Sequence, residues 1–199
     1  GAVVSGKLRI PSLGETIVEK QVAAMAGQPR LMAAWTNSFD EFQIETGEAV
    51  YTDSDLISAK YPLLIGLKDM VVIINANDAV NDKEMRAFEI AADNDRLAGH
   101  VAELIEARTL IILTDVAGVL DEWGRRIPYV DRLEDIEELI KREHSGTGGM
   151  WSKVIVAKEA AKKGIRTVIA NGREQDVLLR IMKGRGEIGT EFISGYMLY

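Results

Sequence analysis

Short polar side chains form two clusters in the middle of the chain, Asn75-Ala76-Asn77-Asp78 and Asp93-Asn94-Asp95. Either cluster alone is typical of turns and helix caps, because Asn and Asp favour strand exits and helix starts. Together, such side chains at one sheet edge are able to hold an ammonium or carboxyl group by hydrogen bonds. They are equally able to arrange lysines and a metal ion around phosphates. The two clusters therefore predict a small-molecule binding site.

A glycine-rich segment, Ser145 to Lys153, opens directly into a predicted helix. Glycines allow backbone N–H groups to close on phosphate oxygens, and a helix N-terminus adds partial positive charge. Lys153 lies about one turn into that helix, where its ammonium group can reach a phosphate. The residue counts between the glycines and the lysine do not fit a P-loop. The alternative interpretation of this segment is a flexible connector.

A third polar pair, Thr114-Asp115, follows an apolar run at 110–113. Polar side chains at the tip of a buried strand are suited to binding an adenine, a ribose or a phosphate. The same pair is also typical of a strand end followed by a turn. In open α/β sheets, ligands bind outside the carboxyl ends of the strands. Thr114-Asp115 occupies such a place, and so do Asn75–Asp78 and Asn171-Gly172.

Alternating helices and strands must position these clusters. Apolar residues recur at spacings of three or four over residues 19–42, which predicts a long helix with a kink or break at Gly27 and Pro29. The run at 110–113 is typical of a parallel strand that is covered on both faces. The order of elements predicts an open α/β fold with a largely parallel sheet. The other predicted strands are 48–51, 71–74, 167–170 and 190–193, and the other predicted helices are 56–67, 93–106, 133–142, 151–163 and 174–182.

The composition excludes several classes of protein. The chain has 199 residues, 47% of them apolar, which suits one domain with a real core and excludes disordered, collagen-like and coiled-coil chains. A net charge of −7 without a long basic run argues against a surface for nucleic acid or anionic membrane. No apolar run approaches the roughly 20 residues that a membrane span requires. The absence of cysteine excludes disulfides and thiolate metal sites, and it favours a reducing, cytoplasmic location.

Taken in order, several segments of this chain resemble the amino acid kinase family, and within it the glutamate 5-kinases. They are Ala24–Met32, Val72–Val80, Asp93–Leu97, Leu113–Val119 and Gly146–Lys153. The last of these, Gly-Thr-Gly-Gly-Met-x-x-Lys, favours glutamate 5-kinases over acetylglutamate or uridylate kinases. The resemblance implies a single kinase domain over residues 1–199, folded as a three-layer α/β/α sandwich with a largely parallel open sheet. It also implies a homo-oligomer.

The resemblance implies ATP-dependent phosphorylation of the γ-carboxylate of L-glutamate with Mg²⁺, the first step of proline biosynthesis. Phosphoryl transfer needs positioning and charge neutralisation rather than a covalent nucleophile, which agrees with the residue types present. The catalytic residues implied are Lys153, Asp93 and Asp95, with no metal assigned to protein side chains. The substrate-binding residues implied are Asp78, Asn94, Asn75 and Gly1. The nucleotide-binding residues implied are Thr114, Asp115, Thr147, Gly148, Gly149, Met150, Trp151, Ser152 and Lys153.

The chain departs from the family's pattern in its predicted substrate loop. Asp78 and Asp93 lie fifteen positions apart, more than the resemblance leads us to expect. Ala92 stands where the family has glycine, and Ala76 stands where it has glutamate. The opening Gly1-Ala2-Val3 resembles the end of a Ser-Ser-Gly-Ala-Val segment of the family. Family members carry a strand-helix-strand segment ahead of it, and often a C-terminal RNA-modification-type (PUA) domain, so we expect a longer chain. Two alternatives stay open: another kinase of the family acting on a different carboxylate or phosphate, and a catalytically silent member that binds nucleotide or amino acid.

Overall fold

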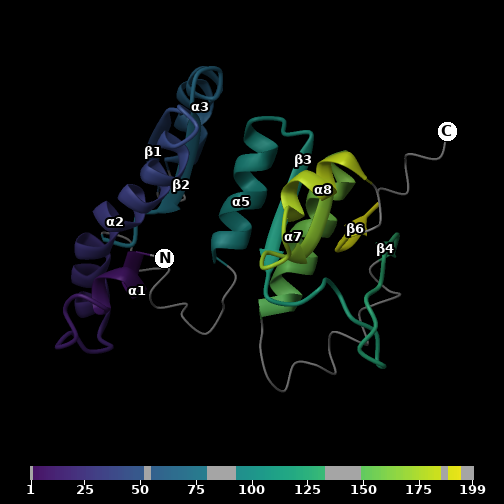
Figure 1. Ribbon diagram of the computed structural model, residues 1–199, viewed down its shortest axis with the longest axis horizontal. Helices are drawn as coiled ribbons and strands as arrows, with labels where there is room; N and C mark the ends of the chain where they lie inside the picture. The colour runs from purple at the N-terminus through teal and green to yellow at the C-terminus, as the bar shows by residue number, and fades with distance from the viewer. Residues whose placement is uncertain (1, 52–54, 80–92, 133–148, 185–187, 194–199) are drawn as a thin grey trace. The chain divides into compact units, whose positions relative to one another are not determined.

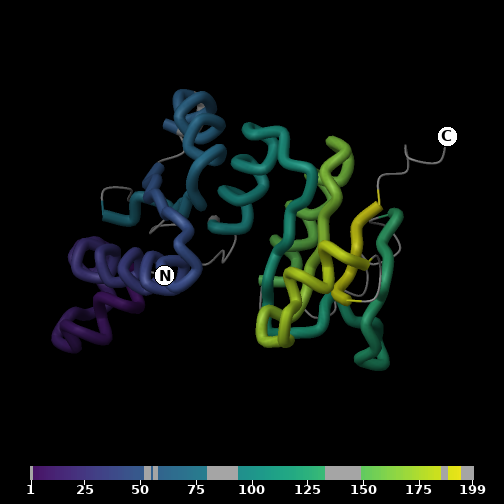
Figure 2. Tube along the Cα trace, turned by 45° about the horizontal axis from the view of Figure 1, so that its top comes forward, coloured from purple at the N-terminus to yellow at the C-terminus, as the bar shows by residue number. Residues whose placement is uncertain are grey.

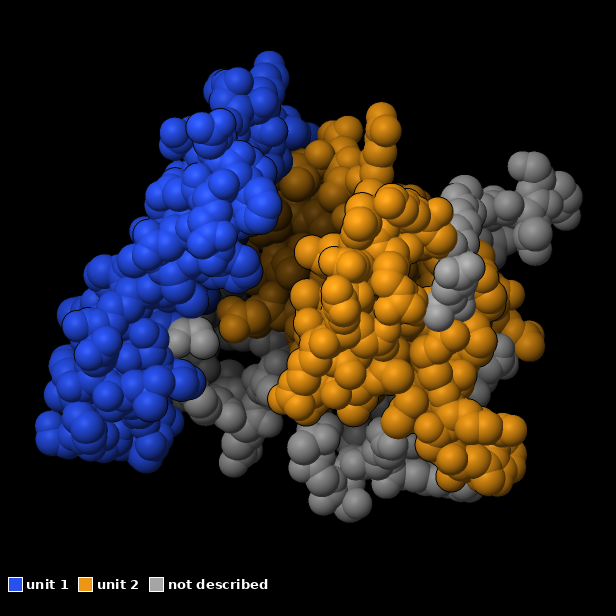
Figure 3. Space-filling view, viewed as in Figure 1, with its two compact units in different colours: residues 1–89 blue, residues 90–199 orange. Residues whose placement is uncertain are grey.

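The computed structural model of the chain describes residues 2–51, 55–79, 93–132, 149–184 and 188–193 (Figures 1 and 2). Contacts divide the chain into two compact units, residues 1–89 and residues 90–199 (Figure 3). Each unit has its own sheet and its own helices, so each is described by itself. None of the helices in the described ranges is long and apolar enough to cross a membrane. The single kinase domain expected over residues 1–199 stays a prediction.

The first unit contains a two-stranded parallel sheet. Its elements are α1 (Ala2–Lys7), α2 (Ile17–Asp40), β1 (Thr46–Tyr51), η1 (Leu56–Ala59), α3 (Lys60–Gly66) and β2 (Val71–Ala76). β1 pairs with β2 in parallel, and Thr46 lies opposite Val71. Both strands confirm the predictions, and each is two residues longer than expected. The helix expected over 56–67 is divided into η1 and α3, which places Pro62 in the first turn of α3, where its missing N–H costs no helical hydrogen bond.

Helix α2 runs without interruption through Gly27 and Pro29, so the chain has no break there, and the kink that was the other expectation stays a prediction. Gly27 instead serves the contact between α1 and α2. A Cβ on Gly27 would lie 1.8 Å from the carbonyl oxygen of Ala2. A Cβ on Gly6 would likewise lie 1.8 Å from the carbonyl oxygen of Ala23. The two glycines therefore let the two helix backbones approach more closely than any side chain would allow.

The N-terminus of α2 is closed by a capping box between Thr16 and Glu19. The backbone N–H of Glu19 donates to the Thr16 hydroxyl at 3.3 Å. In return the backbone N–H of Thr16 donates to the Glu19 carboxylate at 3.1 Å. The Thr16 hydroxyl, followed by backbone N–H groups of Gly14 and Thr16, lowers the pKa of Glu19 through hydrogen bonds to its carboxylate.

The stability of this unit should depend on the ionisation of Glu19. Because the pKa of Glu19 is lower in the folded protein than in the unfolded chain, its contribution is complete above the ordinary glutamate pKa and is lost as the pH falls through the lowered value. We expect urea unfolding to show Glu19→Gln less stable than the wild type at neutral pH and equally stable in acid. NMR titration of Thr16→Val should show the pKa of Glu19 closer to its ordinary range. A stability difference that persists unchanged into acid would contradict the capping role.

The second unit contains a four-stranded sheet in the order β3-β5-β6-β4. Its elements are α5 (Asp93–Leu104), β3 (Thr109–Thr114), β4 (Tyr129–Val130), α7 (Gly149–Lys162), β5 (Arg166–Asn171), α8 (Val177–Lys183) and β6 (Thr190–Phe192). β3 pairs with β5 in parallel, and β4 pairs with β6 in parallel. β5 and β6 are antiparallel. The two sheets are thus mostly parallel, which confirms the prediction.

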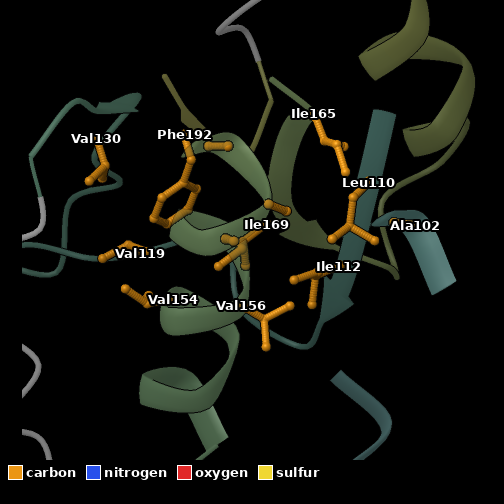
Figure 4. Packing of buried hydrophobic residues seen from close by; sticks show 13 residues of the cluster. Ala102, Leu110, Ile112, Val119, Val130, Val154, Val156, Ile165, Ile169 and Phe192 are labelled. Atoms are coloured by element: carbon orange, nitrogen blue, oxygen red, sulfur yellow. The ribbon is translucent and has the colours of Figure 1, made fainter. Parts of the chain in front are cut away.

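Helices cover both faces of this four-stranded sheet. On one face, Ile112 of β3 and Ile169 of β5 belong to a core that includes residues of α5 and α7 (Figure 4). On the other face, Val168 and Ala170 of β5 pack with buried residues of α8. Successive residues of β5 therefore point to opposite layers, as the two-residue period of a strand requires. The α/β/α layering expected for the fold is confirmed in this unit.

Two local predictions about this unit have different outcomes. Gly164, expected just beyond a helix end, follows α7 with a φ of +83°, a conformation that glycine adopts without strain. Leu113 is 44% exposed, so the burial expected for the whole run 110–113 is wrong at this position. Leu113 belongs to neither of the two cores that cover the faces of this sheet. The helix expected over 133–142 and the loop residues 144–148 lie outside the described residues.

Candidate functional site

Polar groups gather at the carboxyl ends of β3 and β5. Thr114 ends β3 opposite Asn171, the last residue of β5, and the N–H of Gly172 donates to the Thr114 carbonyl at 2.8 Å. The Thr114 hydroxyl donates to Oδ1 of Asp115 at 3.3 Å, and Asp115 is exposed. The sequence predicted this pair at a strand end, and the structure has it at the sheet edge where ligands of open α/β sheets bind.

The turn that follows Asp115 is held by Thr190, which is fully buried at the start of β6. The Thr190 hydroxyl accepts from the N–H of Val119 at 2.8 Å and donates to the carbonyl of Ile127 at 2.7 Å. Gly118 has a φ of +147°, and a Cβ there would lie 2.6 Å from the Thr190 hydroxyl. No sequence signal singled out Thr190, because its role depends on a contact with a residue 71 positions away.

The first residues of α5 and α7 meet in a hydrogen-bonded group of Asp95, Ser152 and Lys153. Lys153 Nζ lies 2.7 Å from Oδ2 of Asp95. The Ser152 hydroxyl donates to the same oxygen at 3.2 Å and to the carbonyl of Gly149 at 3.1 Å. Ser152 is buried, and the side chains of Lys153 and Asp95 are only 19% and 14% exposed. The structure therefore brings together three predicted site residues that lie on two different helices.

The fold explains why these two helix starts meet. α5 leads into β3 and α7 leads into β5, and the two strands run in the same direction. Each helix therefore begins at the carboxyl edge of the sheet, the edge that also carries Thr114 and Asp115. The approach of α5 to α7 is close, since a Cβ on Gly99 would lie 2.8 Å from a methyl group of Val156.

The charges of this group suit an anionic ligand. Asp95 lies in the first turn of α5, where the helix dipole favours a carboxylate. Lys153 lies near the N-terminus of α7, where the dipole adds to its positive charge. A phosphate at that terminus would meet backbone N–H groups and an ammonium group together. Because the pair is largely shielded from solvent, salt screens it less than it screens a surface ion pair.

Met150 and Trp151 anchor the start of α7. Both side chains are partly buried and pack against the core that α7 shares with the sheet. Trp151 and Ser152 also line a pocket of about 300 Å³ between α5 and α7, whose lining does not include Thr114. The nucleotide contacts predicted for Met150 and Trp151 stay predictions.

In the first unit, Asn75 is held by a chain of amide hydrogen bonds. Its Nδ2 donates to Oε1 of Gln28 at 2.8 Å, and Nε2 of Gln28 donates to the Glu48 carboxylate. Asp78 is half-buried two residues beyond the end of β2. Sequence reasoning missed Gln28 and Glu48 as supports of Asn75. Gln28 lies in a segment that carries the family resemblance, and Glu48 had no such signal.

The other predicted site residues are distributed as follows. Asp93 is the first residue of α5, and Asn94 is exposed beside it. Gly1, Thr147 and Gly148 lie outside the described residues. Within the described ranges, no group of three or more His, Asp or Glu side chains is arranged to hold a metal ion. The roles that the sequence assigned to these residues stay predictions.

Comparison with known proteins matches this chain to one protein family. Residues 2–171 match the amino acid kinase family. The chain is 39% identical to glutamate 5-kinase of Syntrophus aciditrophicus (strain SB), over 97% of this chain and 54% of that protein. It is 34% identical to glutamate 5-kinase of Herpetosiphon aurantiacus, over 96% of this chain and 55% of that protein. The chain thus spans about half the length of the curated relatives it matches.

Among solved structures, the fold is similar to that of carbamate kinase from Giardia lamblia bound to AMP-PNP. The TM-score is 0.64 at 18% sequence identity, over 96% of this chain and 79% of that one. At that level of identity the likeness concerns the fold alone.

Proposed function

Because the chain belongs to the amino acid kinase family, we propose that its protein phosphorylates the γ-carboxylate of L-glutamate with ATP, giving γ-glutamyl phosphate and ADP. The observation that carries the proposal is the ion pair of Lys153 with Asp95 at the start of α7. The ammonium group of Lys153 lies at the carboxyl edge of the sheet, in a chain whose curated relatives are named glutamate 5-kinases.

In the proposed reaction, an oxygen of the glutamate γ-carboxylate attacks the γ-phosphorus of ATP in line. The bond from that phosphorus to the bridging oxygen breaks, and ADP leaves with the electron pair. No enzyme group forms a covalent bond, so catalysis consists of positioning the two anions and neutralising the charge on the transferring phosphoryl group. Lys153 is proposed to supply that neutralisation, and Asp95 is proposed to orient its ammonium group.

The nucleotide is proposed to lie at the carboxyl edge of the four-stranded sheet. Thr114 and Asp115 would contact ATP there, and backbone N–H groups at the start of α7 would contact its phosphates. Mg²⁺ in such sites is held by substrate phosphates and one or two carboxylates rather than by an all-protein cage. The exposed carboxylate of Asp115 is of the required kind, and we propose that Mg²⁺ arrives with ATP.

The expected homo-oligomer is also proposed. Val18, Val22 and Met25 recur at helical spacing along α2 and are 67%, 40% and 56% exposed. An exposed apolar row of this kind suits contact with a second copy of the chain.

The test of the proposed function is an assay of acceptor-dependent ADP formation by the full-length protein. ATP and Mg²⁺ would be supplied with glutamate, aspartate, acetylglutamate or UMP, and the acyl phosphate would be trapped with hydroxylamine. Turnover with glutamate alone supports the proposal. Turnover with another acceptor would identify a different kinase of the family. Turnover with none would contradict the proposal and support the alternative of a catalytically silent family member.

Asp78→Ala should mainly weaken glutamate binding. The proposed role of Asp78 is to accept a hydrogen bond from the substrate's ammonium group, and hydrogen bonds to charged groups contribute enough to change affinity about 10- to 100-fold. We expect the KM for glutamate to rise by about that factor, with the KM for ATP unchanged. Asp69→Ala, in the turn that precedes β2, is the matched control and should leave both values unchanged. An unchanged glutamate KM in Asp78→Ala would remove Asp78 from the substrate site.

A further inference from the structure

The hydroxyl of Ser152 is shared between two acceptors. It lies 3.1 Å from the carbonyl oxygen of Gly149 and 3.2 Å from Oδ2 of Asp95. A serine hydroxyl has one proton, and a carbonyl and a carboxylate only accept. Ser152 is 8% exposed, so little water competes for that proton. The proton is therefore divided between the helix backbone and the Asp95 carboxylate.

Lys153 uses the same carboxylate oxygen. Its Nζ lies 2.7 Å from Oδ2 of Asp95, so this oxygen accepts from both side chains. An ammonium group that turns toward a phosphate gives up at least part of its hydrogen bond to Asp95. Asp95 is only 14% exposed, and a shielded carboxylate that loses a donor is destabilised. Something must take the place of Lys153 on that oxygen if the lysine is to move readily.

The Ser152 hydroxyl, 3.2 Å from Oδ2 of Asp95, is close enough to take the place of Lys153 on that oxygen. The carbonyl of Gly149 lies in the first turn of α7, where a helical carbonyl also accepts the backbone N–H four residues later. It therefore keeps a donor when the Ser152 proton turns wholly to Asp95. We propose that Ser152 is a positioning residue, which stabilises the Asp95 carboxylate while Lys153 engages the transferring phosphoryl group. This proposal rests on the proposed function. It gives the Ser152 side chain a positioning role in place of the direct nucleotide binding that the resemblance implies.

Kinetics of Ser152→Ala separate the two roles. Loss of the hydroxyl holds Lys153 more tightly on Asp95, so kcat should fall about tenfold, while the KM for ATP and the KM for glutamate stay within about twofold. Ser152→Thr retains a hydroxyl and should restore most of kcat. If the side chain binds nucleotide instead, the KM for ATP will rise with little change in kcat, and the proposal is overturned.

The matched control is Ser38→Ala. The Ser38 hydroxyl also donates to a helix carbonyl, that of Ala34 at 2.8 Å, and Ser38 is exposed on α2. This variant should leave both kcat and KM unchanged. An equal fall in kcat in Ser38→Ala and Ser152→Ala would show that a helix hydroxyl of any kind has this effect, which would overturn the proposal.

A double-mutant cycle tests whether Ser152 acts through Asp95. In an Asp95→Asn background the carboxylate is gone, so Ser152→Ala should change kcat by less than about twofold. A further tenfold fall in that background would mean that Ser152 acts by another route, and it would contradict the proposal.

A chemical readout keeps this test independent of kinase activity. The rate at which acetic anhydride acetylates Lys153, followed by peptide mass spectrometry, reports how often its amine is free of Asp95. We expect slower acetylation in Ser152→Ala than in the wild type, and no change in Ser38→Ala. Equal rates in all three proteins would overturn the proposal. Slower acetylation in a protein that phosphorylates none of the acceptors would reject the proposed function while supporting the role of Ser152 on Asp95.

Discussion

Replacing Lys153 with alanine should lower kcat by about 100- to 1000-fold, the loss typical when one preorganised charge-stabilising group is removed. Lys153 lies near the start of α7, and its Nζ lies 2.7 Å from Oδ2 of Asp95. Its charge is needed most when the phosphoryl group lies between donor and acceptor oxygens. The KM for glutamate should therefore change little. Initial rates with saturating ATP and glutamate measure the effect.

Lys163→Ala is the matched control for this variant. Lys163 follows α7 directly and forms an ion pair with Glu103, and its side chain is 51% exposed. This substitution removes the same functional group and an exposed ion pair, away from the sheet's carboxyl edge. We expect near wild-type rates from it, and unchanged circular dichroism from both variants. A kcat within about threefold of wild type in Lys153→Ala would remove Lys153 from the mechanism.

Glu191→Ala should lower the free energy of unfolding by about 3–5 kcal/mol, the largest loss of stability among the variants named above. Glu191 is 7% exposed on β6. Its carboxylate accepts from Nε of Arg166 at 2.9 Å and from Nη2 at 3.1 Å. Arg166 also donates to the carbonyls of Ile181 and Gly184 at the end of α8. Truncation would leave a shielded guanidinium without its counter-charge, and urea unfolding followed by circular dichroism measures the cost.

The control is Glu103→Ala, which breaks the exposed pair with Lys163. Exposed ion pairs contribute about 0–1 kcal/mol, so this variant should unfold almost as the wild type does. A double variant that replaces both Arg166 and Glu191 with apolar residues of similar size should recover much of the lost stability, because it leaves no unpaired buried charge. Equal losses in Glu191→Ala and Glu103→Ala would contradict the role assigned to the buried pair.

Local sequence patterns predicted most elements of the second unit. Each strand or helix there is a short segment, and the apolar spacing and the end signals that mark it lie within it or next to it. Gly164, just after α7, is one such end signal. The same is true of Thr114-Asp115, because the end of a strand is a local feature. In the first unit the break expected at Gly27 does not occur, since a glycine required by a neighbouring helix has the same sequence signature as one that ends its own helix.

By itself, the sequence determined the family and the order of elements, because motif order and apolar periodicity are visible in the sequence without knowledge of packing. It also predicted Lys153 and Asp95 as site residues. Only the tertiary structure decided that Lys153 and Ser152 share one oxygen of Asp95, and that Arg166 pairs with Glu191. These contacts join residues 25 to 58 positions apart. Hydrogen bonds depend on distance and orientation within fractions of an ångström, and those follow from how α5 packs on α7 and how β5 pairs with β6.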